Sequence, residues 1–121
     1  MARTEPIIAV NDIPTSTKFY QDLLDSTPTH GGSSFEILTD DSVVLLCLHR
    51  WTEHEHPTMK NPSNPGNGLI LLFRVDDLYE TYERAEKMKA KIEEGIHYNN
   101  NSLKNQFTLW DLDGYYLIIS E

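Results

Sequence analysis

The chain has 121 residues, 39% of them hydrophobic, which is enough for one compact domain with a buried core. Its net charge of −9 argues against nucleic-acid binding, which needs a basic surface, and no apolar run approaches the ~20 residues that span a membrane. The first residues lack the features of a signal peptide, and the single cysteine, Cys47, cannot form an internal disulfide, so we expect a cytoplasmic protein.

The first half of the chain predicts a strand, a helix and then further strands. Residues 6–10 are apolar and predict a short strand, after which Asn11 or Asp12 can cap a helix. Pro28 limits residues 27–29 to a weak edge strand. Residues 35–38 and 43–49 predict a hairpin. The buried stripe of the helix is expected to consist of Ile13, Thr17, Tyr20 and Leu24.

The second half repeats this order after an irregular linker at residues 50–67. Residues 69–75 form the most apolar predicted strand, and Asp76 or Asp77 is expected to cap the second helix. Gly95 is expected to end the helical region, with a strand at residues 96–98 and a final hairpin at residues 107–120. The stripe of the second helix is expected to consist of Leu78, Tyr82, Ala85 and Met88.

The two halves also match in sequence. A shift of 72 positions lays residues 35–38 on residues 107–110, and a shift of 65 positions lays residues 10–13 on residues 75–78. We therefore interpret the chain as one unit written twice, with modules at about 1–60 and 66–121 joined by the irregular loop.

These motifs, taken in order, resemble the vicinal oxygen chelate superfamily of glyoxalases, bleomycin-resistance proteins and extradiol dioxygenases. The resemblance is carried by residues 10–13, 19–20, 66–69, 75–77 and 107–116, and it extends over nearly the whole chain. It implies an α+β fold of paired βαβββ modules, whose curved mixed sheets enclose a ligand cavity. It also implies a homodimer, in which the modules pair either within one chain or across a swapped dimer.

The resemblance further implies four metal-ligating positions, two in each module. They fall on Glu5, Leu46, Ile70 and Ile118. Three of these side chains are aliphatic and offer no lone pair, whereas a catalytic divalent ion normally needs at least three protein ligands. We therefore expect no metal, no cofactor and no catalytic residue, unless the alignment of the two modules is wrong by one position.

Strand alternation predicts which side chains line the cavity. Ile70, Arg74, Tyr116 and Ser120 should face inward with Ile118, while the alternate residues pack under the helices. By the repeat, Leu46 and Leu48 also line the cavity. If Trp110 pairs with Tyr115, Phe107 and Leu109 face inward as well, as would Phe35. The expected ligand-binding residues are Glu5, Phe35, Leu46, Arg74, Phe107, Tyr116 and Ile118.

The histidines do not form a recognised ligand pattern. Glu53, His54, Glu55 and His56 share a proline-rich loop that we interpret as exposed, although a metal there stays possible. His30 and His97 are expected to be edge residues that could reach a ligand.

Three functions remain open. The expected cavity is apolar and aromatic, which favours a small-molecule binding protein that sequesters its ligand without the usual metal. The alternatives are a metal-dependent lyase or dioxygenase with displaced ligands, and a non-catalytic dimeric interaction module.

Overall fold

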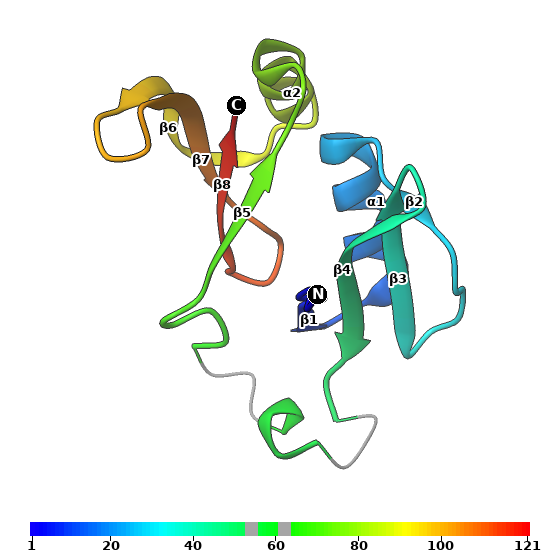
Figure 1. The fold of residues 1–121 in the computed structure, drawn as a ribbon. Coiled ribbons are helices and arrows are strands. Elements are labelled where there is room, and N and C mark those ends of the chain that lie inside the picture. The colour runs from blue at the N-terminus through cyan, green and yellow to red at the C-terminus, as the bar shows by residue number, and fades with distance from the viewer. Residues whose placement is uncertain (53–55, 61–63) are drawn as a thin grey trace. The chain divides into compact units, whose positions relative to one another are not determined.

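A computed structural model describes residues 1–52, 56–60 and 64–121. The chain divides into two compact units, Met1–Pro65 and Gly66–Glu121, and each is considered by itself below (Figure 1). Within the described residues, no helix is long and apolar enough to cross a membrane.

The Met1–Pro65 unit holds a four-stranded mixed sheet with the strand order β1-β4-β3-β2. Strand β1 runs parallel to β4, and the other two pairings are antiparallel. The elements are β1 (Ile7–Val10), α1 (Ile13–Leu24), β2 (Thr27–Pro28), β3 (Phe35–Asp40), β4 (Val43–Arg50) and the short 3-10 helix η1 (Pro57–Met59).

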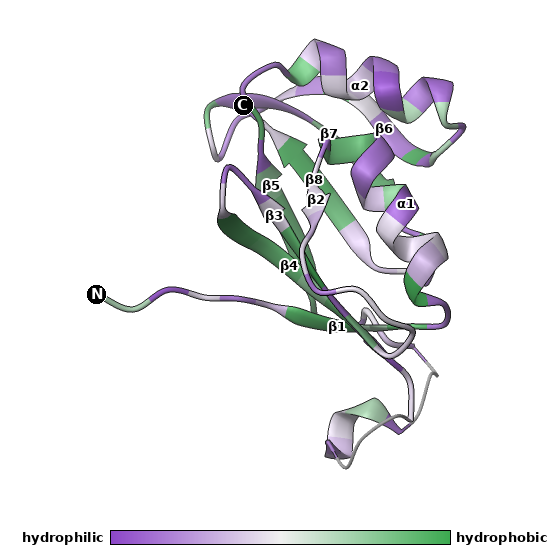
Figure 2. Cartoon of the chain, turned by 90° about the vertical axis from the view of Figure 1, so that its right-hand side faces the viewer, coloured by the Kyte–Doolittle hydropathy of each residue, from purple (hydrophilic) through white to green (hydrophobic). Residues whose placement is uncertain are grey.

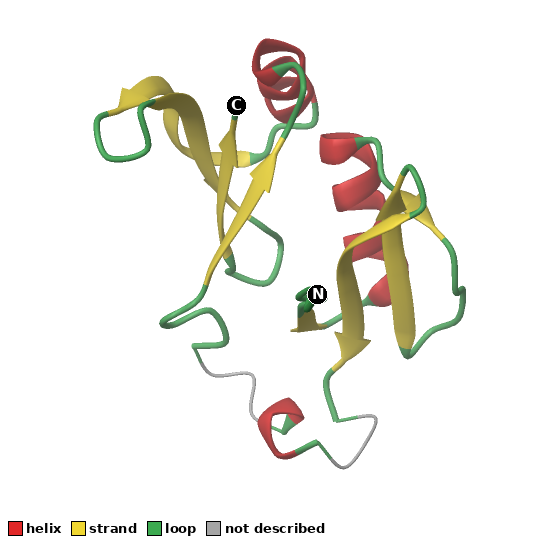
Figure 3. Cartoon of the chain, in the orientation of Figure 1, coloured by secondary structure: helices red, strands yellow, loops and turns green. Residues whose placement is uncertain are grey.

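The Gly66–Glu121 unit repeats this topology with the order β5-β8-β7-β6 (Figure 3). Strand β5 is parallel to β8, as β1 is to β4. The elements are β5 (Ile70–Arg74), α2 (Leu78–Lys87), β6 (Lys91–Asn99), β7 (Lys104–Trp110) and β8 (Tyr116–Ser120). The expected strand, helix and three strands of each module are therefore confirmed, and both sheets are open.

Both α-helices begin at an aspartate cap. The Asp12 carboxylate accepts a hydrogen bond from the Thr15 backbone N–H at 3.0 Å, and Asp77 accepts one from Glu80 at the same distance. Side-chain and backbone hydrogen bonds from Thr15 hold the pKa of Asp12 below its ordinary value. Each cap satisfies an N–H group that has no partner inside the helix.

Buried hydrophobic residues of the strands and helices form the cores of the units. Figure 2 shows hydrophobic residues, in green, along the strands of both sheets. In α1 the buried stripe includes Leu23, whereas the predicted Leu24 lies at its edge. In α2 the buried residues are Leu78, Thr81 and Ala85, with Tyr82 half-buried beside them.

Strand β6 is longer than expected and contains Gly95, which was wrongly placed as the end of the helical region. A Cβ atom at Gly95 would lie 3.1 Å from the Tyr82 hydroxyl, so this glycine lets α2 approach the strand closely. The pairing of β6 with β7 also shifts register twice.

Candidate functional site

The sheet of the Gly66–Glu121 unit has one face covered by α2. The rings of Tyr82 on α2 and Phe107 on β7 are in contact, with centroids 5.0 Å apart. Phe107 lies opposite Ile119, and Ile119 lies opposite Phe73 on β5. Opposite residues on neighbouring strands point to the same face, so all three belong to the helix-covered face.

The alternate residues of β5 and β8 form the other face, which we call the open face. Ile70 is 58% exposed and Leu72 is 46% exposed, while Tyr116 and Ile118 are half-buried. Their alternation with Leu71, Phe73, Leu117 and Ile119 is the predicted one. Large apolar side chains thus remain accessible on the open face.

Strand register arranges the open face in three rows, each crossing the strands in the order β5, β8, β7, β6. The aromatic row is Ile70, Tyr116, Trp110 and Lys91. The central row is Leu72, Ile118, Thr108 and Glu94. The polar row is Arg74, Ser120, Gln106 and His97.

The aromatic row offers a flat apolar contact surface. Trp110 and Tyr116 pack edge to face with centroids 4.9 Å apart, and the Lys91 ammonium lies 6.0 Å from the Trp110 ring. The Trp110 indole N–H donates to Glu93 at 3.0 Å, which fixes the orientation of the ring.

The polar row is a hydrogen-bonded chain. One guanidinium nitrogen of Arg74 donates to the Ser120 hydroxyl at 3.4 Å and to the main-chain oxygen of Glu121 at 2.8 Å. Gln106 accepts from the Asn99 amide at 3.0 Å and lies 3.4 Å from His97 Nε2. Because a carbonyl only accepts, His97 Nδ1 donates to Gly95 O at 2.8 Å, and its Nε2 can accept from Gln106.

The central row contains a hydroxyl that lacks a hydrogen-bond partner. Thr108 is 2% exposed, and its Oγ1 has no hydrogen-bond partner among the described residues. Buried polar groups of this kind are uncommon and usually meet a water or a ligand.

The placement of Phe107 contradicts the prediction. It was expected to face inward with Tyr116, but it lies opposite Ile119 on the helix-covered face, as does Leu109 opposite Leu117. The turn spans five residues rather than four, because Trp110 pairs with Tyr116 and not with Tyr115. The Asp111 carboxylate accepts from Asp113 and Tyr115 N–H groups inside this turn.

The corresponding face of the Met1–Pro65 unit carries different side chains. Strand register puts Ile7, Cys47 and Ile37 in one row, and Ala9, His49 and Phe35 in the next. Phe35 therefore lies on the face that was predicted for it. Leu46 does not, because it lies opposite Leu38 and belongs with the fully buried Leu48 on the other face.

The error at Leu46 comes from the offset between the modules. Cys47 lies opposite Ile7 in parallel strands, just as Ile118 lies opposite Leu72. Cys47 and Ile118 are 71 positions apart, whereas the sequence match used 72. The position equivalent to Ile118 is therefore Cys47, not Leu46.

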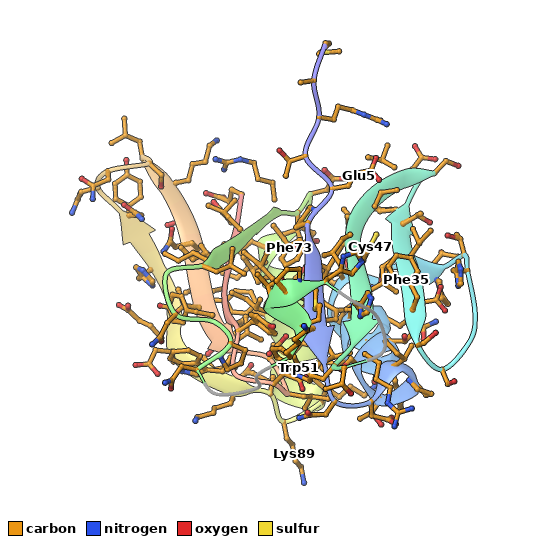
Figure 4. All side chains as sticks on the ribbon, turned by 90° about the horizontal axis from the view of Figure 1, so that it is seen from below. Glu5, Phe35, Cys47, Trp51, Phe73 and Lys89 are labelled. Carbon is orange, nitrogen blue, oxygen red and sulfur yellow. The ribbon has the colours of Figure 1, made fainter. Side chains whose placement is uncertain are left out.

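The implied metal positions therefore fall on Glu5, Cys47, Ile70 and Ile118. Glu5 and Cys47 are near each other on the Met1–Pro65 unit (Figure 4), but burial, with a smaller contribution from the Glu5 charge, raises the pKa of the Cys47 thiol. Within the Gly66–Glu121 unit both positions are aliphatic. Among the described residues no group of three His, Cys, Asp or Glu side chains could hold a metal ion, so these residues do not fit the usual metal.

Sequence reasoning missed His49, which is buried beside the predicted Phe35. Its ring lies 6.1 Å from Phe35 and 5.5 Å from His56, while His30 contacts Phe35 at 5.2 Å. Cys47 and His49 are two positions apart on β4 and share one face, and this spacing is the signal that could have found His49. Glu53, His54 and Glu55 lie outside the described residues.

Glu36 fixes the loop that precedes β3. Its carboxylate accepts from the backbone N–H groups of His30 at 2.7 Å, Gly31 at 2.9 Å and Ile37 at 2.9 Å. Burial favours a raised pKa, but the three N–H donors outweigh it and hold the pKa of Glu36 below its ordinary value. The ionised carboxylate thus positions His30 beside Phe35.

Comparisons with known proteins agree with this architecture. A family model described as the glyoxalase/bleomycin resistance protein/dioxygenase superfamily matches residues 2–118. A comparison with curated protein sequences gives no match.

Several solved structures share the fold over nearly their whole length. A protein from the mobile metagenome of V. Pseudocholerae is 26% identical, with a TM-score of 0.73 and coverage of 99% of this chain and 94% of the other. A bleomycin resistance determinant encoded on transposon Tn5 is 19% identical, with a TM-score of 0.71 and coverage of 100% and 98%. A fosfomycin resistance protein from Listeria monocytogenes is 12% identical, with a TM-score of 0.73 and coverage of 99% and 92%.

Proposed function

Because the chain belongs to the glyoxalase/bleomycin resistance protein/dioxygenase superfamily, we propose that it binds and sequesters a small apolar or aromatic molecule without the metal usual in that family. The observation that carries this proposal is the exposed apolar surface of the open face, formed by Ile70, Leu72, Tyr116 and Ile118. A cytoplasmic homodimer is part of the same proposal.

The chemistry of the open face favours binding over catalysis. Its aromatic and central rows offer apolar contact area, which would gain roughly 25 cal/mol for each Å² removed from water. Of the acidic side chains nearby, Glu93 is already engaged because it accepts the Trp110 N–H, whereas Glu94 lies 3.6 Å from His97 Nδ1 and forms an ion pair only when His97 is protonated.

A metal-dependent lyase or dioxygenase is the second candidate, and one observation favours it. The corrected offset places a thiol, Cys47, beside Glu5 where an aliphatic side chain was expected. Glu5 and Cys47 supply only two ligands, however, and the aliphatic Ile70 and Ile118 add none, whereas a catalytic divalent ion normally needs at least three. The non-catalytic interaction module is the third candidate and predicts no small-molecule binding at the open face.

The test uses N-phenyl-1-naphthylamine, an uncharged aromatic probe that fluoresces in apolar surroundings. We expect saturable binding to the native protein, with affinity reduced about tenfold in Tyr116→Ala because the ring contact is lost. Tyr79→Ala is the matched control, because Tyr79 is exposed on α2. Absence of saturable binding, or equal loss in both variants, would contradict the proposal.

A further inference from the structure

We propose that the ligand of the open face is an amphiphilic anion, with a flat aromatic body over the aromatic and central rows and a carboxylate, sulfonate or phosphate group at Arg74. This inference rests on the proposed function and adds the chemical class of the ligand.

Arg74 is a positioned cation at one end of the face. Two hydrogen bonds from one nitrogen, to Ser120 and to the Glu121 main-chain oxygen, hold the guanidinium in place. No carboxylate side chain of the described residues pairs with it, although the whole chain has 19 acidic and 10 basic residues. A guanidinium has five N–H donors in a planar fork that matches a carboxylate or phosphate, so donors remain for a ligand.

The other charged groups on this side of the sheet are less suited to a ligand. Glu93 accepts the Trp110 N–H, and Glu94 lies beside His97. Lys91 lies near the Trp110 ring at the opposite end of the sheet. Arg74, which has donors to spare, is therefore the charged group on this face that is best arranged to pair with a ligand, and the ligand charge that it selects is negative.

The spacing of the rows defines the size of the ligand. Ile70 and Arg74 are four positions apart on strand β5, which corresponds to roughly 13 Å at the usual rise per residue. A body of two or three aromatic rings spans the aromatic and central rows and leaves its anionic group at the polar row.

Thr108 provides an independent indication that the centre of the face meets a polar ligand atom. Its hydroxyl is buried between Ile118 and Glu94 in the central row and has no hydrogen-bond partner in the described part of the chain. A ring oxygen or nitrogen of the ligand would supply that partner once the side chains adjust to binding.

The experiment compares two probes that share one aromatic body. One is 8-anilinonaphthalene-1-sulfonate, and the other is N-phenyl-1-naphthylamine, which lacks the sulfonate. We expect the sulfonate to bind about tenfold more tightly to the native protein, because a charge-assisted hydrogen bond is added. Arg74→Gln should abolish this preference and leave the affinity for the uncharged probe within about twofold.

Arg84→Gln is the matched control, since Arg84 lies on α2 beside Glu80, and it should preserve the preference. Near-UV circular dichroism establishes that each variant keeps its packing. Equal affinity for the two probes, or a preference that survives in Arg74→Gln, would overturn the anion assignment while the proposed function stands. Failure of both probes to bind would overturn both.

Discussion

The Tyr82 and Phe107 rings meet edge to face, with centroids 5.0 Å apart and an interplanar angle of 78°. This contact joins α2 to the centre of β7 and determines which face of the sheet is covered. It also leaves Tyr116 and Trp110, which lie on the alternate positions of the same hairpin, on the open face.

Phe107→Ala should therefore act on stability rather than on ligand binding. Removing this fully buried ring leaves a cavity between helix and sheet, and we expect the free energy of unfolding to fall by about 3–5 kcal/mol. Urea denaturation followed by circular dichroism measures the loss. Tyr98→Ala is the control, because Tyr98 is exposed on β6 and should cost less than about 1 kcal/mol. Similar losses in the two variants would contradict the assignment of Phe107 to the core.

Glu36 should make stability depend on pH. Its pKa in the folded protein is lowered, so its contribution is fully present above the unfolded value of about 4.5 and is lost as the pH falls through the lower folded value. Glu36→Gln should reduce the free energy of unfolding at pH 7 by about 1–3 kcal/mol, because charge-assisted hydrogen bonds are lost. It should also remove this part of the acid sensitivity.

Urea denaturation between pH 3 and pH 7 measures this dependence. Glu83→Gln is a suitable control, because Glu83 is exposed on α2 and carries no comparable set of N–H donors in the described structure. If the free energy of unfolding of Glu36→Gln falls between pH 7 and pH 3 as steeply as that of the native protein, the loop does not depend on the ionised carboxylate.

The turn should require a glycine at position 114 because of its backbone conformation, and not because a side chain there would lack space. Its φ is +93°, and a Cβ atom added there would meet nothing within 4 Å. Gly114→Ala should therefore lower the free energy of unfolding by about 1 kcal/mol through backbone strain, without a steric clash. Thermal unfolding provides the measurement, and Leu112→Ala in the same turn is the control, since Leu112 is 57% exposed. An unchanged melting temperature would contradict the strain.

Most of the fold could be predicted from the sequence, because hydrophobic spacing and caps are local signals. Asp12 and Asp77 begin the helices as expected, and β5 and β8 alternate as predicted. Strand β6 could not be bounded, because its course depends on the approach of Tyr82 to Gly95 and on two register shifts.

The candidate site was harder to predict, because the face of a side chain depends on register. A single-residue change in pairing moves a residue to the opposite face. The assumed pairing of Trp110 misplaced Phe107, and the offset of 72 misplaced Leu46. Phe35 was assigned to the correct face because two errors cancelled. The offset of 72 matched Phe35 to Phe107, and the assumed pairing of Trp110 placed Phe107 on the open face.

The central claim is that the chain is a binding protein without the metal usual in its family. A measurement of metal content tests this claim most directly. The purified protein is loaded separately with Zn²⁺, Ni²⁺, Mn²⁺ and Fe²⁺, dialysed extensively, and measured by elemental analysis. Because Ile70 and Ile118 offer no lone pair and leave only Glu5 and Cys47 as ligands at these positions, we expect far less than one bound metal per chain. Retention of about one metal per chain, lost in Glu5→Ala and in Cys47→Ala, would contradict this account and indicate a metal-dependent enzyme.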